Sequence, residues 1–174
     1  MKIKALLAVL VLAASIVILG YVSIRESSYN DVGSLKELSA PTRVTVTGDL
    51  VDLGDGILLM NYKGGTYTLE ARGVYAIAQG PEGEYAVFLL KGGNGFMVVA
   101  LYPASEFVSK YGGSPLFEEK VIVQGIYMPG ETVVIGLPSP DGVKPLYEAP
   151  LLKVDAILKG CHSSYQQRQA SITG

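Results

Sequence analysis

The first 25 residues set the strongest limit on how the chain can be organised. Ala5 to Ile24 is an uncharged run of twenty residues, which is long enough for a helix that crosses a bilayer core. Two lysines precede the run, whereas the arginine after it is followed at once by a glutamate. Because positive charge favours the cytoplasmic side, we predict a transmembrane anchor over residues 1–25, in a single-pass protein of the cell membrane. Residues 26–174 then lie on the extracytoplasmic side.

A cleaved signal peptide is the alternative interpretation of this segment. Leu12-Ala13-Ala14-Ser15 supplies small residues of the kind found at cleavage sites. We favour the uncleaved anchor because the apolar run continues well beyond that point. With either interpretation the rest of the chain is exported.

The composition of the remaining chain is typical of an all-β domain. The protein has 21 glycines and 11 tyrosines in 174 residues, with abundant valine. Glycine supplies the positive φ angles of tight turns, while β-branched and aromatic side chains suit a pleated sheet. The length leaves room for one domain of ordinary size.

The charge balance argues against a nucleic-acid partner. Fourteen lysines and arginines face sixteen acidic residues, for a formal net charge of −2. Such a balance gives no general field that would attract a polyanion.

The order of predicted elements fits an OB-fold-like small barrel over residues 43–160 with one short helix. A linker over residues 26–42 contains a capping box, Ser34 to Glu37, and so a short helix. The further elements are a strand at Arg43–Leu53 that changes phase near Gly48, hairpins at Ile57–Ala71 and Tyr85–Leu101, a helix at Pro103–Tyr111, strands at Val121–Tyr127 and Thr132–Gly136, a Pro-rich loop at Leu137–Pro145, and a last strand at Leu151–Ile157.

The only cysteine and the only histidine of the chain are neighbours, Cys161 and His162. They follow the last predicted strand, in surroundings that we expect to be exposed. A lone cysteine in an exported protein has no disulfide partner within the chain, so it is a reactive or intermolecular thiol, or else an inert one. Lys159 nearby would favour the thiolate, the form that attacks electrophiles and binds soft metals.

The segment resembles that of a known family of heme carriers. A membrane-anchored OB-like domain whose last strand runs into Cys161-x-x-x-Tyr165 is similar to the cytochrome c maturation heme chaperones, the CcmE family, in their Cys-x-x-x-Tyr variant. The stretch Val154–Gly160 resembles the lead into that motif. Upstream, Leu35–Leu38, Arg43–Gly48 and Phe117–Gly125 resemble the family's entry into its first strand and its later Val-x-Val-x-Gly strand.

The resemblance implies a carrier and not a turnover enzyme. Such a carrier binds heme transiently and covalently outside the membrane and delivers it to apocytochrome c, with membrane-bound cytochrome c maturation proteins as partners. It further implies that Cys161 bonds a heme vinyl group and that Tyr165 is an axial ligand of the heme iron, which tyrosinate is known to be. Residues 161–174 would then be a heme-binding segment and flexible tail.

The roles of the other candidate ligands stay open at this point. His162 is a candidate second iron ligand, a base for the thiol, or a bystander. Met60, Met97 and Met128 lie in strand or turn patterns, so we expect them to pack in the core.

Two other classes of protein are compatible with the same elements. An exported OB-fold module could bind an oligomer, and the charge balance favours a saccharide over nucleic acid as that oligomer. Alternatively, the module could tether a membrane complex. Metal delivery is a weaker variant of the carrier hypothesis, because one short Cys-His cluster stands without a second cysteine or a Met-rich motif.

Overall fold

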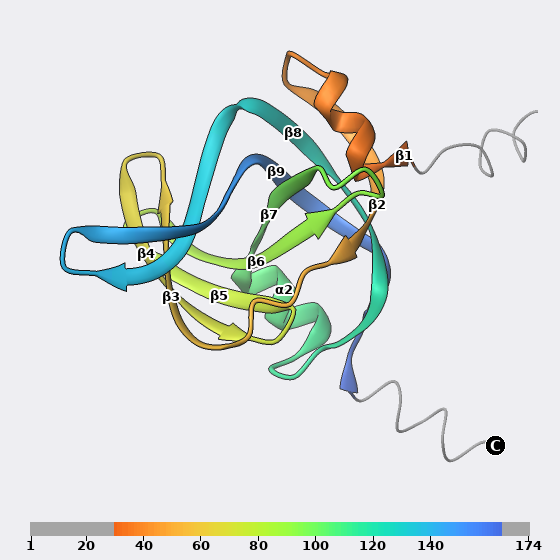
Figure 1. The fold of residues 1–174 in the computed structure, drawn as a ribbon. Helices are drawn as coiled ribbons and strands as arrows, with labels where there is room; N and C mark the ends of the chain where they lie inside the picture. Colours follow the sequence, from red (N-terminus) through yellow and green to blue (C-terminus); the bar gives the residue numbers. More distant parts are fainter. Residues whose placement is uncertain (1–29, 165–174) are drawn as a thin grey trace, which may run out of the picture.

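A computed structural model describes residues 30–164, which form an all-β domain with one short α-helix (Figure 1). Its elements in chain order are β1 (Asn30–Asp31), the 3-10 helix η1 (Val32–Glu37), β2 (Thr42–Leu50), β3 (Asp55–Tyr62), β4 (Gly65–Arg72), β5 (Tyr75–Gly80), β6 (Gly83–Lys91), β7 (Met97–Pro103), α2 (Ala104–Tyr111), β8 (Leu116–Ser139) and β9 (Gly142–His162).

The strands close into a seven-stranded barrel. The ring runs β3-β4-β5-β6-β7-β9-β8 and returns to β3, with β7 and β9 as the parallel pair and every other neighbour antiparallel. The long strands β8 and β9 lie side by side and extend beyond the barrel as a two-stranded ribbon, on the left of Figure 1.

A second and smaller ring shares part of this wall. Strand β2 pairs with β8 along most of its length and then with β6 at Asp49 and Leu50, which closes the ring β2-β6-β7-β9-β8. Strand β1 and helix η1 pack against this ring, and α2 connects β7 to β8. The connectivity is consistent with the predicted OB-like barrel, with β3, β4 and β5 inserted between its first two strands.

The shared wall separates two hydrophobic cores. Successive side chains of a strand point to opposite faces, so alternate residues of β6 and β7 enter different cores. Phe88, Leu90, Val98 and Ala100 pack in the core of the smaller ring, while Val87, Leu89, Val99 and Leu101 pack in that of the larger ring. This double burial explains why both strands are continuously apolar where a half-exposed strand would alternate.

Several sequence predictions are confirmed by these elements. Both hairpins are present, β3–β4 and β6–β7. The first turns at Lys63 and Gly64, whose φ angles of 49° and 73° suit the type I′ turn that matches strand twist. Helix α2 begins directly after Pro103, as predicted. Met60 is fully buried, and Met97 and Met128 pack against the same core.

Other sequence predictions were wrong in detail. Residues 137–145 are not a loop, because Leu137–Ser139 pair with β9. Here β8 and β9 form a two-stranded ribbon, so each strand has one unpaired edge. A proline placed where its backbone nitrogen faces that edge removes no hydrogen bond between the strands. Strand β5 was missed, since the alanines that face its core are poor strand formers.

The N-terminal part of the described chain is built into the barrel. The N-cap of η1 is Asp31 and not Ser34, and its carboxylate accepts hydrogen bonds from the N–H groups of Gly33 and Gly93. The side chain of Asn94 donates to the carbonyl of Gly33, so the β6–β7 loop holds η1 from the other side. The predicted linker therefore already belongs to the folded domain from residue 30 onward.

Within residues 30–164, no helix is long and apolar enough to cross a membrane. The predicted anchor over residues 1–25 lies outside the described residues.

Candidate functional site

The predicted site residues Cys161 and His162 are the last two residues of β9, not of a segment that follows the strand. Cys161 pairs with Phe117 and His162 pairs with Leu116 at the start of β8. Because neighbouring side chains of a strand point to opposite faces, the thiol and the imidazole lie on different sides of the sheet. Their adjacency in sequence therefore does not make them a joint pair of ligands in this arrangement.

The thiol of Cys161 is buried, contrary to the exposure predicted from its polar neighbours. The residue is 8% exposed and belongs to the core of the smaller ring. Burial raises the pKa of the Cys161 thiol to about 12, because an apolar environment disfavours the thiolate. Lys159 therefore does not activate it here, and the residue is a neutral thiol at physiological pH.

An aromatic cluster lies in the same core as the thiol. Phe107 of α2 is 1% exposed and is the centre of the cluster. Its ring centroid lies 5.4–6.3 Å from those of five other rings: Tyr75, Phe88, Tyr102, Tyr111 and Phe117. The end of β9 therefore rests on an apolar surface that α2, β5, β6, β7 and β8 build together.

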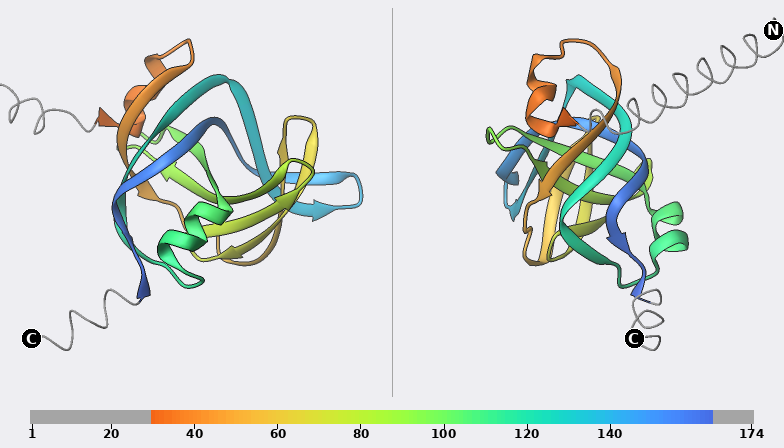
Figure 2. Two further views of the ribbon diagram at one scale, coloured as in Figure 1. Left: turned by 180° about the vertical axis from the view of Figure 1, so that it is seen from behind. Right: turned by 90° about the vertical axis from the view of Figure 1, so that its right-hand side faces the viewer.

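Tyr111 is the residue that ties α2 to β9, although no role in the site was predicted for it. Its hydroxyl donates a hydrogen bond to the carbonyl of Ile157 at 3.3 Å. Burial, and next the nearby Cys161, raise its pKa to about 12. The right-hand view of Figure 2 shows α2 on the outside of the barrel beside the end of β9. The helical spacing from Phe107 to Tyr111 predicted a short helix, but not this contact with the cysteine.

His162 faces solvent and pairs with an acidic residue. Its Nε2 lies 2.9 Å from Oε1 of Glu118, and both side chains are about 50% exposed. A pair at the surface contributes at most about 1 kcal/mol. The imidazole is accessible to a ligand once Glu118 releases it.

Tyr165, the predicted iron ligand, lies outside the described residues. Among residues 30–164, no group of three His, Cys, Asp or Glu side chains could hold a metal ion. Of the predicted site residues, the structure therefore places Cys161 and His162 and no others.

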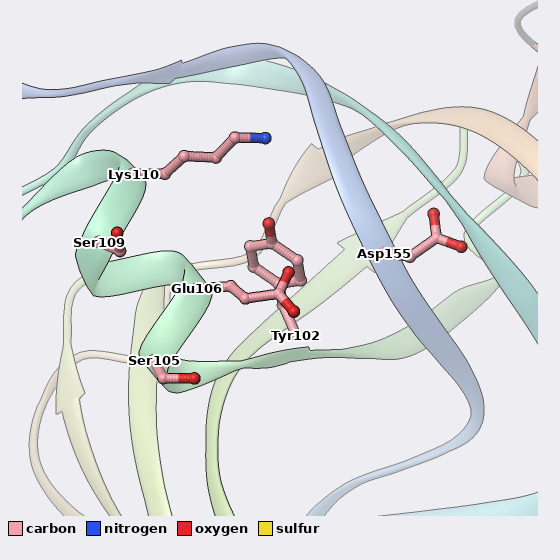
Figure 3. A pocket seen from close by; sticks show the side chains of 6 residues that line it. All are labelled: Tyr102, Ser105, Glu106, Ser109, Lys110 and Asp155. Atoms are coloured by element: carbon pink, nitrogen blue, oxygen red, sulfur yellow. The ribbon is translucent and has the colours of Figure 1, made fainter.

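A polar groove lies between α2 and β9 (Figure 3). It has a volume of about 430 Å³ and is lined by Tyr102, Ser105, Glu106, Ser109, Lys110 and Asp155. Burial and the neighbouring Glu106 carboxylate raise the pKa of Tyr102, and Asp155 forms an ion pair with Arg43 at 2.8 Å. A groove with these groups suits a polar ligand better than the apolar face of a porphyrin.

Comparisons of the chain with protein-family models, with curated proteins and with solved structures find no match.

The buried thiol makes the stability of the domain depend on pH in the alkaline range. Since the pKa of Cys161 is higher in the folded than in the unfolded chain, its contribution is complete below the unfolded pKa of about 9. It is lost as pH rises toward 12, by at most about 1.4 kcal/mol per pH unit. Tyr111 acts in the same direction from about pH 10 upward.

We expect urea midpoints of the wild type to fall more steeply between pH 8 and 10.5 than those of Cys161→Ala. Comparing the two pH slopes removes the contribution of the titrating groups that do not interact with Cys161. The contribution of Tyr111, whose pKa the nearby Cys161 also raises, changes in the same direction. Parallel slopes would contradict the burial of the thiol.

Proposed function

We propose that this chain is an exported heme carrier, held to the membrane by residues 1–25, which transiently bonds heme through Cys161 and passes it to apocytochrome c. The observation that carries the proposal is the position of the only cysteine. Cys161 stands at the end of the last strand of an OB-like barrel, four residues before Tyr165. This is the arrangement of the Cys-x-x-x-Tyr heme chaperones that the sequence resembles.

The surface around the end of β9 supports an apolar cargo. The aromatic rings around Phe107 lie in the same core as Cys161, and three large aliphatic side chains of α2, β8 and β9 are exposed. These are Val108 at 48%, Leu116 at 41% and Leu158 at 50%. Exposed apolar side chains on a monomeric domain often belong to binding surfaces. A porphyrin needs such cover for at least one face.

Thiol addition to a heme vinyl group is chemically balanced without a further reactant. The sulfur bonds to the vinyl carbon next to the porphyrin ring, and the thiol proton ends on the terminal carbon. No electron is gained or lost, so neither an oxidant nor a reductant is needed. Release is the reverse reaction, which restores the vinyl group and returns the proton to sulfur.

The proposed iron ligands complete the site. Tyr165 would supply a phenolate, a hard ligand that favours ferric iron. His162 remains a candidate second ligand, because its imidazole is exposed and occupied only by the surface pair with Glu118. Partner proteins in the membrane would supply heme and accept it.

The proposal is tested by covalent heme retention. The full chain is purified from cells that also express a cytochrome c maturation system, and its intact mass is measured after denaturation. We expect wild type to keep the mass of one heme and Cys161→Ala to lose it completely. We expect Tyr165→Phe to keep the heme but change its visible spectrum.

Matched controls separate site effects from misfolding. Tyr147→Phe changes a tyrosine outside the proposed site and should leave the spectrum unaltered, and circular dichroism establishes that each variant is folded. If wild type never carries heme, or if Cys161→Ala retains it covalently, the carrier proposal fails. The chain is then better described as an exported OB-like binding or tethering module.

A further inference from the structure

We infer that Gly160–His162, the last three residues of β9, form a latch that hides the Cys161 thiol in the barrel and releases it by local opening while the barrel stays folded. The inference deepens the proposed function, on which its biological purpose rests, because a thiol that bonds heme must leave the core.

The latch is separated from the rest of β9 by an interruption in the ladder. The register of β9 on β8 shifts at several places, and the last shift along β9 lies between the pair Ile122–Lys159 and the pair Phe117–Cys161. Between these pairs, four residues of β8 stand opposite Gly160 alone. A bulge of this kind disrupts cooperative pairing, so the two terminal pairs can separate without loss of those before them.

Gly160 has the backbone geometry of a hinge in this position. Its φ angle is +88°, a conformation that other residues adopt at a steric cost. A Cβ atom at this position would lie 2.2 Å from the carbonyl oxygen of Lys120 and 2.9 Å from the Cα of Val121. Both contacts are with backbone, which cannot rotate away. The bulge therefore depends on glycine.

Among residues 30–164, the contacts of Gly160–His162 differ in part from those that hold the strand before the bulge. The hydrogen bond from Tyr111 reaches Ile157, which lies before the bulge, so this bond fixes the strand, while the Tyr111 side chain also lies near Cys161 in the latch. The latch itself has two strand pairs with β8, the buried Cys161 side chain and the surface pair of His162 with Glu118. Segments with so few buried contacts open at a small fraction of the global unfolding free energy.

The structure of the latch therefore links the access of the thiol to the exposed contact between His162 and Glu118. With the latch closed, the thiol is neutral and shielded from reagents. With the latch open, it lies in water and is available to an electrophile. Glu118 contributes to the balance because its carboxylate contacts the strand end from outside.

The test is the rate at which iodoacetamide alkylates Cys161, the only thiol, in the heme-free full chain in detergent at neutral pH. We expect wild type to react at least ten times more slowly than a free cysteine, with a rate almost independent of urea well below the unfolding midpoint. Glu118→Gln should raise the rate by two- to fivefold, as expected for loss of a surface pair of up to about 1 kcal/mol. The exposed neighbour provides the control, and Glu119→Gln should leave the rate unchanged.

Gly160→Ala provides a second variant with a larger effect. We expect at least a tenfold faster alkylation of Gly160→Ala than of wild type, provided that circular dichroism shows a folded barrel. If Gly160→Ala does not fold, the comparison of Glu118→Gln with Glu119→Gln still decides the test. A wild-type rate that rises with urea as steeply as global unfolding would overturn the latch, and so would equal rates for Glu118→Gln and Glu119→Gln. Alkylation requires no heme, so this result is independent of the heme-retention experiment.

Discussion

Replacing Phe107 with alanine is expected to lower the free energy of unfolding by about 3–5 kcal/mol, the range for removal of a fully buried aromatic side chain. Phe107 is 1% exposed and lies within 6.3 Å, between ring centroids, of five other aromatic rings. Its loss leaves a cavity between α2 and the barrel wall that the surrounding strands cannot fill. Urea titration followed by circular dichroism measures the change.

Val108 provides the control for this substitution. It lies on the same helix but is 48% exposed, so Val108→Ala should change the unfolding free energy by less than about 0.5 kcal/mol. Equal losses for the two variants would contradict the assignment of the effect to the aromatic cluster, because alanine is the best helix former and helix propensity cannot explain a loss.

Replacing Gly125 with alanine is expected to cost about 3 kcal/mol or more, at the upper end for overpacking. Gly125 pairs with Val44 on one side and Val154 on the other. An added Cβ would lie 2.0 Å from the carbonyl oxygen of Lys153. Since the obstacle is backbone inside the barrel, the strands β8 and β9 would have to move apart.

Gly130→Ala is the matched control for this change. Gly130 lies five residues further along β8, and a Cβ at that position would meet nothing within 4 Å. Thermal unfolding should therefore show a large drop in midpoint for Gly125→Ala and little change for Gly130→Ala. Similar midpoints would show that the close approach of β8 and β9 at Gly125 is relieved without cost.

The parts of the fold that depend on local sequence could be predicted, while the pairing of distant strands could not. Lys63-Gly64-Gly65 between two strand-like runs was sufficient to predict the first hairpin, because glycine-rich hairpin turns have a specific chemistry. The pairing of β2 with β8 joins Val46 to Val123, and no local signal encodes it. The unbroken apolar runs of β6 and β7 did carry information about two cores, since a strand buried on both faces does not alternate.

The candidate site shows the same division. The residue types Cys161 and His162 were found from sequence, because each is the only one of its kind in the chain. The buried environment of Cys161 was not predicted from sequence, because Lys159 and Ser163 beside the two residues are polar and indicated exposure. Burial of the thiol is decided by Phe117 and α2, which are distant in sequence.

Because both rings close only through β8 and β9, the order of synthesis has a consequence for this chain. A chain that has emerged only as far as α2 has its first strands in place but two open sheets, each with unpaired edges of the kind that invite aggregation. The core of the larger ring has all its residues once Leu151 has arrived, whereas the core of the smaller ring also needs Ile157 and Cys161. Completion of the smaller ring and delivery of the only thiol are thus one event, so a copy truncated before Cys161 would present an incomplete core to a partner.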